Sequence, residues 1–128
     1  MALTVPDVGE NTMLDMILKD ASPNAQELHL YSAISPAISE TTVVANFTEA
    51  TFTGYALITL VRATWNAASG GTSTYPQQSW SPTSSETIIG YWVEEVTGGE
   101  VMWVEPFTAS RALNNGDTLN LDLSISLA

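Results

Sequence analysis

The clearest hydrophobic pattern lies at the end of the chain, in residues 119–127. Apolar side chains occupy every second position and polar side chains fill the positions between: Leu119, Leu121, Leu123, Ile125 and Leu127 alternate with Asn120, Asp122, Ser124 and Ser126. Successive side chains of a strand point to opposite faces. The segment is therefore predicted to be a strand with one face in the core and the other in water.

A β-hairpin is predicted over residues 88–107. Two runs rich in aromatic and β-branched residues flank Gly98-Gly99, a combination typical of a tight turn between antiparallel strands. After the hairpin, residues 108–115 are expected to form a loop. This loop should turn at Asn114-Asn115-Gly116-Asp117.

Three further segments have strand patterns. Residues 27–31 alternate, which places Leu28 and Leu30 on one face and His29 and Tyr31 on the other. Residues 55–65 carry apolar side chains on both faces and are predicted to form a central strand that is covered on each side. Residues 75–82 contain two prolines, which favours an edge strand.

One segment, from about residue 8 to about residue 20, is predicted to be helical. Asp7 is placed as its N-cap, with Glu10 three residues later in a capping-box arrangement. Apolar residues follow at helical spacing and form one stripe: Met13, Leu14, Ile17, Leu18 and Ala21. The stripe must be buried, either against the protein's own sheet or against a neighbouring subunit.

The fold class predicted from these elements is mainly β, an antiparallel β-sandwich or barrel with one short N-terminal α-helix. The 128 residues are expected to form a single domain (1–128), with strands from about residue 26 onward. The chain contains no cysteine, so disulfides and cysteine-ligated metals are excluded.

The charge balance is strongly acidic. Lys19, Arg62 and Arg111 face fourteen acidic residues, and the net charge is −11. Such a chain repels phosphate, so we expect no nucleic-acid partner and no anionic membrane. The charge either serves solubility or forms an acidic face that meets a basic patch on a protein. No secretory leader and no membrane-length apolar run are recognised, so we expect folding inside a cell.

Catalytic and cofactor chemistry finds little support. The single histidine, His29, lies in the middle of a predicted strand, where a structural role is favoured over that of a catalytic base. A histidine-based metal site fails on the number of histidines, and no cofactor is expected. Calcium could be bound by Asp117, Asp122 or the glutamates, although no loop has the regular ligand spacing.

The hairpin glutamates must be weighed as a carboxylate pair for glycoside hydrolysis. These are Glu94, Glu95, Glu100 and Glu105. Their place near a hairpin end favours solvated charges that oppose edge-to-edge pairing. We therefore predict no enzymatic activity.

The aromatic residues of the hairpin indicate an interface. Because Tyr91 and Trp92 are successive, they face opposite sides of the sheet, and one ring must be covered by a loop or a subunit. Aromatic side chains buried by a partner dominate binding energy. The candidate interface residues are Met13, Ile17, Tyr91, Trp92 and Trp103.

Several segments occur together in a familiar order. They are Val5-Pro6-Asp7-Val8-Gly9-Glu10, Phe47-Thr48-Glu49, Phe52-Thr53-Gly54-Tyr55, Ile89-Gly90-Tyr91-Trp92-Val93, Trp103-Val104-Glu105-Pro106-Phe107 and Asn115-Gly116-Asp117-Thr118-Leu119. This order resembles a set of small tailed-bacteriophage virion proteins, head decoration or cement proteins and related minor structural proteins. The resemblance spans nearly the whole chain, and its motifs are turns, anchors and a helix start.

The resemblance implies a non-enzymatic virion structural protein that binds and stabilises the assembled head. Its expected partners are the major capsid protein and further copies of itself, in a trimer or dimer. Its expected location is the capsid surface, after assembly in the host cytoplasm. The alternative is a tail or fibre component that binds carbohydrate or adapts another tail protein.

Overall fold

The computed structural model describes residues 5–19, 25–96 and 99–127. About half of the described residues are in strands, 49% against 16% helical, the sheets are antiparallel, and these residues contain a single α-helix. The predicted fold class is therefore confirmed, and the arrangement is compatible with a β-sandwich. The described residues form two compact units. The prediction of a single domain stays a prediction.

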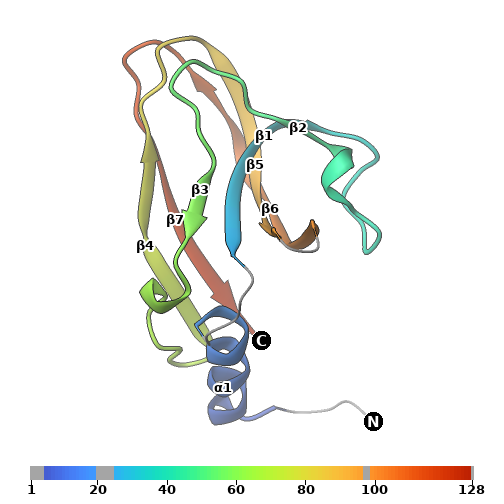
Figure 1. Ribbon diagram of the computed structural model, residues 1–128, viewed down its shortest axis with the longest axis vertical. Coiled ribbons are helices and arrows are strands. Elements are labelled where there is room, and N and C mark those ends of the chain that lie inside the picture. Colours follow the sequence, from blue (N-terminus) through green and yellow to red (C-terminus); the bar gives the residue numbers. More distant parts are fainter. Residues whose placement is uncertain (1–4, 20–24, 97–98, 128) are drawn as a thin grey trace. The chain divides into compact units, whose positions relative to one another are not determined.

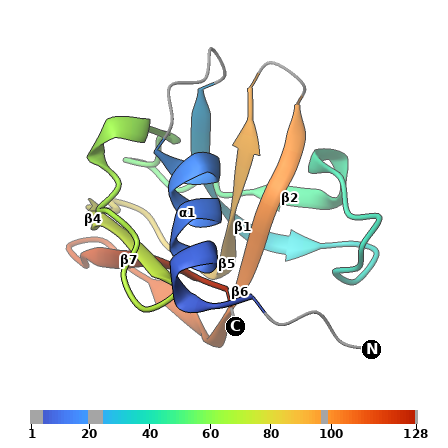
Figure 2. The same cartoon turned by 90° about the horizontal axis from the view of Figure 1, so that it is seen from below.

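The first unit contains helix α1 (Asp7–Leu18), the short helix η2 (Arg62–Thr64) and most of two paired strands, β4 (Thr72–Trp80) and β7 (Leu119–Ser126). The alternation predicted for the C-terminal strand is confirmed, since Leu119, Leu121 and Leu123 are buried and their neighbours are exposed. Helix α1 lies at the end of the pair where β4 begins and β7 ends (Figures 1 and 2).

Hydrogen bonds connect α1 to residues 62–71. The side chain of Asn11 accepts a hydrogen bond from the Gly71 N–H at 2.8 Å, and that of Asp15 accepts one from the Ala68 N–H at 2.9 Å. Near the helix end, Arg62 donates to the Ile17 carbonyl and Lys19 to the Trp65 carbonyl. Both cations thus lie near the last turn, where they interact favourably with the helix dipole.

Two details of the helix prediction were wrong. Pro6 occupies the N-cap position without a side-chain bond, and Asp7 is the first helical residue. Proline suits a helix start because its fixed φ is compatible with the helix and its missing N–H is not needed there. The apolar stripe is also split: Leu14 and Leu18 are buried, whereas Met13 and Ile17 are exposed. Ala21 lies outside the described residues.

The second unit is built around a five-stranded antiparallel sheet (Figure 1). The strand order is β2 (Phe47–Glu49), β1 (Gln26–Ile34), β5 (Glu86–Glu95) and β6 (Glu100–Leu113). The short helix η1 (Val44–Asn46) precedes β2, and β3 (Ile58–Leu60) pairs with the other half of the same edge of β1. Strand β1 therefore has β5 along one edge and β2 and β3 along the other.

The hairpin prediction is confirmed and its length was underestimated. Strands β5 and β6 pair from Glu95↔Glu100 to Glu86↔Leu113. The expected loop at residues 108–115 was wrong for most of its length, because this segment continues β6 beside the start of β5. The turn at residues 114–117 is confirmed, with Asp117 accepting a bond from the Asn114 N–H and Gly116 at φ 92°.

The central strand predicted at residues 55–65 was wrong. Only Ile58–Leu60 is a strand, and it pairs with β1 alone. Tyr55 lies outside this strand and contacts β1 through its side chain, because its hydroxyl accepts a hydrogen bond from the Leu30 N–H. The strand predicted at residues 75–82 is confirmed for residues 75–80, which belong to β4 in a two-stranded sheet.

Candidate functional site

The most distinctive chemistry lies on one face of the five-stranded sheet, around His29. Strand alternation places Glu27, His29 and Tyr31 on this face of β1. The register with β5 sets Glu27 opposite Glu94 and His29 opposite Trp92. Side chains directly opposite on neighbouring antiparallel strands meet on the same face. Strand alternation and the register between β1 and β5 therefore bring these side chains together on one face.

Trp92 is the aromatic centre of the cluster. The His29 ring stacks on the indole at 4.6 Å between centroids and the Phe47 ring at 4.4 Å, both nearly parallel to it. Tyr31 meets the Phe47 ring edge-on at 5.0 Å. Trp92 and Tyr31 are almost completely buried. The sequence predicted that a loop or a subunit must cover one of the two rings, Tyr91 or Trp92. On this face, Phe47 of the same chain covers Trp92.

Glu49 of β2 holds His29 from one side. His29 Nδ1 and the Tyr55 hydroxyl both donate to Glu49 Oε1, each at 2.6 Å. A carboxylate can only accept, so Nδ1 carries a proton. Burial, followed by the hydrogen bond to Glu49, raises the pKa of the Tyr55 hydroxyl above its ordinary value. Tyr55 therefore stays a neutral donor.

On its other side, His29 faces Glu27 and Glu94. Nε2 lies 3.6 Å from Glu27 Oε2 and 3.8 Å from Glu94 Oε1. Both distances are too long for hydrogen bonds. The second oxygen of Glu94 accepts a bond from Trp92 Nε1 at 3.1 Å. The expectation that the hairpin glutamates are solvated was wrong for Glu94, whose side chain is only 15% exposed.

The opposite face of β5 carries Tyr91. Its hydroxyl donates to Glu105 Oε2 of β6 at 2.5 Å, and burial, then this bond, raises the pKa of Tyr91. Tyr91 and Trp92 are thus buried on opposite faces, as the parity of the strand requires. Trp103 of β6 is half-buried, and its indole nitrogen is buried. The assignment of these residues and of Met13 and Ile17 to an interface stays a prediction.

Two tyrosines of this sheet provide a matched test of the polar contacts. Tyr31→Phe is expected to leave the free energy of unfolding unchanged or slightly raise it, because the buried Tyr31 hydroxyl makes no hydrogen bond. Tyr91→Phe removes the bond to Glu105 and should lower stability by about 1 kcal/mol. Urea unfolding of both variants measures the difference, and an equal loss in both would contradict this account of the contacts.

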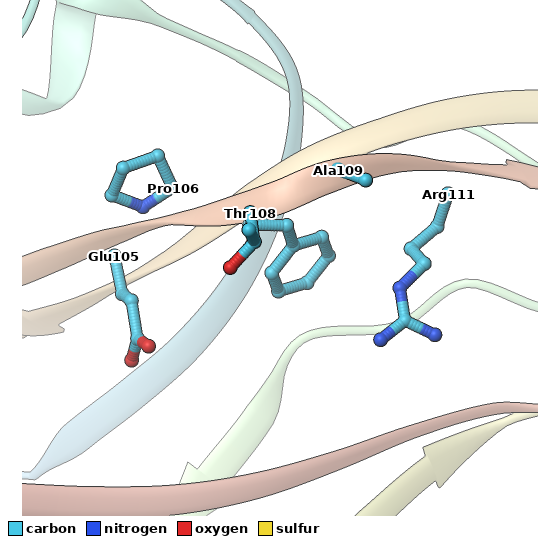
Figure 3. A pocket seen from close by; sticks show the side chains of 6 residues that line it. Glu105, Pro106, Thr108, Ala109 and Arg111 are labelled. Carbon is cyan, nitrogen blue, oxygen red and sulfur yellow. The ribbon is translucent and has the colours of Figure 1, made fainter.

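An open hollow of about 380 Å³ lies along β6. It is lined by Glu105, Pro106, Phe107, Thr108, Ala109 and Arg111 (Figure 3). The Arg111 guanidinium lies 5.8 Å from the centroid of the Phe107 ring. One strand supplies every lining residue, so the hollow is a surface feature with a cation, a carboxylate and an aromatic ring.

The aspartates considered for calcium do not come together. Asp117 caps its own turn, and Asp122 accepts a bond from Gln77. Among the described residues, one group of acidic and histidine side chains has metal-binding proximity: Glu27, His29 and Glu94, with ligand atoms within 4.8 Å of one another. Sequence reasoning placed His29 on its face correctly, but it missed Glu49 and Glu94 as neighbours.

Comparison with known proteins adds no relative. No protein-family model matches the chain, and no curated protein matches it significantly. In the described residues, no helix has the length and apolarity needed to cross a membrane.

Proposed function

We propose that this protein is a non-enzymatic structural component of a tailed-bacteriophage virion. Specifically, it is a decoration or cement protein that binds the major capsid protein on the surface of the assembled head. The observation that carries this proposal is the exposed apolar face of α1. Val8, Met13, Met16 and Ile17 are 41–78% exposed on a helix of 12 residues.

The exposed residues of α1 are not needed to anchor the helix. Leu14 and Leu18, one turn apart, are already buried, and Asn11 and Asp15 bond to the backbone of residues 68–71. Met13, Met16 and Ile17 form a second stripe at spacings of three and four residues, a neighbouring face of the helix. A contiguous exposed apolar patch marks a protein-binding surface.

Several carboxylates accept hydrogen bonds that hold segments of the fold together, which supports a non-enzymatic function. Glu86 accepts bonds from the backbone N–H groups of Thr51 and Phe52 at 2.8 and 2.7 Å. Glu105 accepts from Tyr91, and Asp15 holds the helix. These acidic side chains connect segments of the fold, which is a sufficient reason for their presence.

Many copies on one shell explain how a small domain stabilises a capsid. Each copy buries a modest apolar patch, and multivalency adds strength without any single strong contact. Self-association into a trimer or dimer with closed symmetry fits this task. Assembly takes place in the host cytoplasm, and the net charge of −11 keeps the unassembled protein soluble.

One observation favours the second candidate, a tail or fibre component that binds carbohydrate. Glu105, Thr108 and Arg111 line the hollow on β6 (Figure 3), and Phe107 lines it too, with its ring centroid 5.8 Å from the Arg111 guanidinium. Sugar-binding sites combine polar groups with an aromatic face in this way. A glycan array tests this candidate directly, and specific binding that is lost in Phe107→Ala would favour it over the head protein.

Co-sedimentation with empty shells of the same phage's major capsid protein tests the main proposal. We expect the protein to sediment with the shells and to raise their melting temperature. The double variant Met16→Lys/Ile17→Lys should abolish binding, because it places two charges in the proposed contact. Val43→Lys is the matched control, since Val43 is also exposed but lies in the segment between β1 and β2. A monomer that never co-sediments, or equal loss in the control, contradicts the proposal.

A further inference from the structure

We propose that Glu27, His29 and Glu94 bind one divalent transition-metal ion of the zinc class. The proposal is independent of the virion function, because it rests only on the geometry of the five-stranded sheet. Counting histidines in the sequence argued against such a site. However, a single imidazole is sufficient when two carboxylates complete the ligand set.

The three ligand atoms converge on one point. His29 Nε2 lies 3.6 Å from Glu27 Oε2 and 3.8 Å from Glu94 Oε1, and all three atoms fall within 4.8 Å of one another. Ligand atoms bound to zinc lie about 2.0–2.2 Å from the metal. Small rotations of the two glutamate side chains therefore bring the atoms onto a shared ion.

The buried imidazole nitrogen provides an independent indication. The His29 side chain is 94% buried, and Nε2 makes no hydrogen bond. Nδ1 carries the ring proton and donates a hydrogen bond to Glu49. The neutral ring therefore directs the lone pair of Nε2 towards Glu27 and Glu94. A lone pair between two carboxylates is unfavourable unless a cation lies among them. A metal ion bound at this point supplies that positive charge.

The hydrogen bonds around the cluster orient two of its ligand groups as metal sites require. Metal-binding histidines almost always donate their other N–H to an acceptor such as a carboxylate, as His29 does to Glu49. Glu94 is oriented in a similar way, because Trp92 Nε1 binds its other oxygen.

The ligand chemistry selects the class of metal. Calcium and magnesium prefer all-oxygen sites, whereas imidazole suits zinc and neighbouring transition metals. Three protein ligands leave a fourth position for water or for a side chain of another protein. The ion would also offset the negative charges of Glu27 and Glu94, which face the neutral His29 ring.

The composition of the chain makes the test unusually direct. His29 is the only histidine and there is no cysteine, so every imidazole nitrogen signal belongs to His29 and no thiol competes. Zinc chloride is titrated into the full-length ¹⁵N-labelled protein, followed by NMR of the imidazole nitrogens and by calorimetry. We expect one zinc per chain, a large shift of Nε2 and retention of the Nδ1 proton. EDTA should reverse the change.

Variants distinguish the site from general acidity. Glu27→Gln and Glu94→Gln should each reduce zinc affinity about 100-fold or more, whereas Glu49→Gln, which keeps an acceptor oxygen but removes the negative charge that orients His29, should cost about 10–100-fold. The matched control is Glu100→Gln, which removes the same charge from exposed β6 and should leave affinity unchanged. An imidazole that keeps two protons at saturating zinc, or equal binding by the Glu27→Gln and Glu100→Gln variants, overturns the proposal. The wild-type imidazole signal decides the question even if a variant fails to fold.

Discussion

Replacing Trp92 by alanine is expected to lower the free energy of unfolding by about 3–5 kcal/mol. The indole is almost fully buried on β5 and carries two parallel rings, His29 and Phe47, at 4.6 and 4.4 Å. Truncation removes both stacking contacts and leaves a cavity that the strands β1 and β5 cannot close without breaking their register. Chemical denaturation followed by circular dichroism measures the loss.

Two further variants separate the causes of this loss. Trp92→Phe keeps a ring for stacking but removes the Nε1–H bond to Glu94, so it should cost clearly less than the alanine variant. Phe107→Ala is the control for removing an aromatic ring, because Phe107 is only half-buried on β6. A loss of equal size in Phe107→Ala and Trp92→Ala would show that Trp92 does not anchor the sheet.

Gly90→Ala is expected to destabilise the protein by about 1–3 kcal/mol, the usual range for overpacking. A Cβ at this position would lie 2.5 Å from the Tyr31 hydroxyl oxygen and 2.6 Å from the Glu105 carbonyl oxygen. Neither atom can easily move, since Tyr31 is buried and the carbonyl belongs to the paired strand β6. Thermal unfolding measures the change.

The same substitution in the helix should have the opposite sign. Gly9→Ala gains up to about 1 kcal/mol of helix propensity. Its Cβ would approach only the Val5 Cγ1 at 2.9 Å, which is one methyl group of a side chain that can rotate. If Gly90→Ala were as stable as Gly9→Ala, the close approach of Tyr31 to β5 would be refuted.

Errors in the strand predictions share a physical cause. Residues 55–65 are apolar on both faces, which predicted a long central strand, yet only Ile58–Leu60 find a pairing partner. Conversely, residues 108–113 lack a hydrophobic alternation, yet they pair with the start of β5, as Ile88↔Arg111 shows. Backbone pairing along a sheet depends on which strand lies alongside, and the side-chain pattern of one segment does not contain that information.

In the candidate site, too, the side-chain pattern of a single strand predicted some features, whereas others depend on which strands lie side by side. Period-two alternation was sufficient to place His29 and Tyr31 on one face of β1, and the parity of residues 91 and 92 was sufficient to place their rings on opposite faces of β5. The partners of His29 could not be found in this way. Glu49 and Glu94 come from two other strands, and only the register of β1 with β2 and β5 brings them to the ring.

By itself, the sequence determined the mainly antiparallel β class, the hairpin, the one-sided C-terminal strand and the strong acidity, because these follow from local periodicity, turn residues and composition. The tertiary structure alone decided which helix face stays exposed, how Phe47 covers Trp92 and why His29 faces three carboxylates. Those features depend on contacts between segments distant in the chain, which form only when strand register and packing are established.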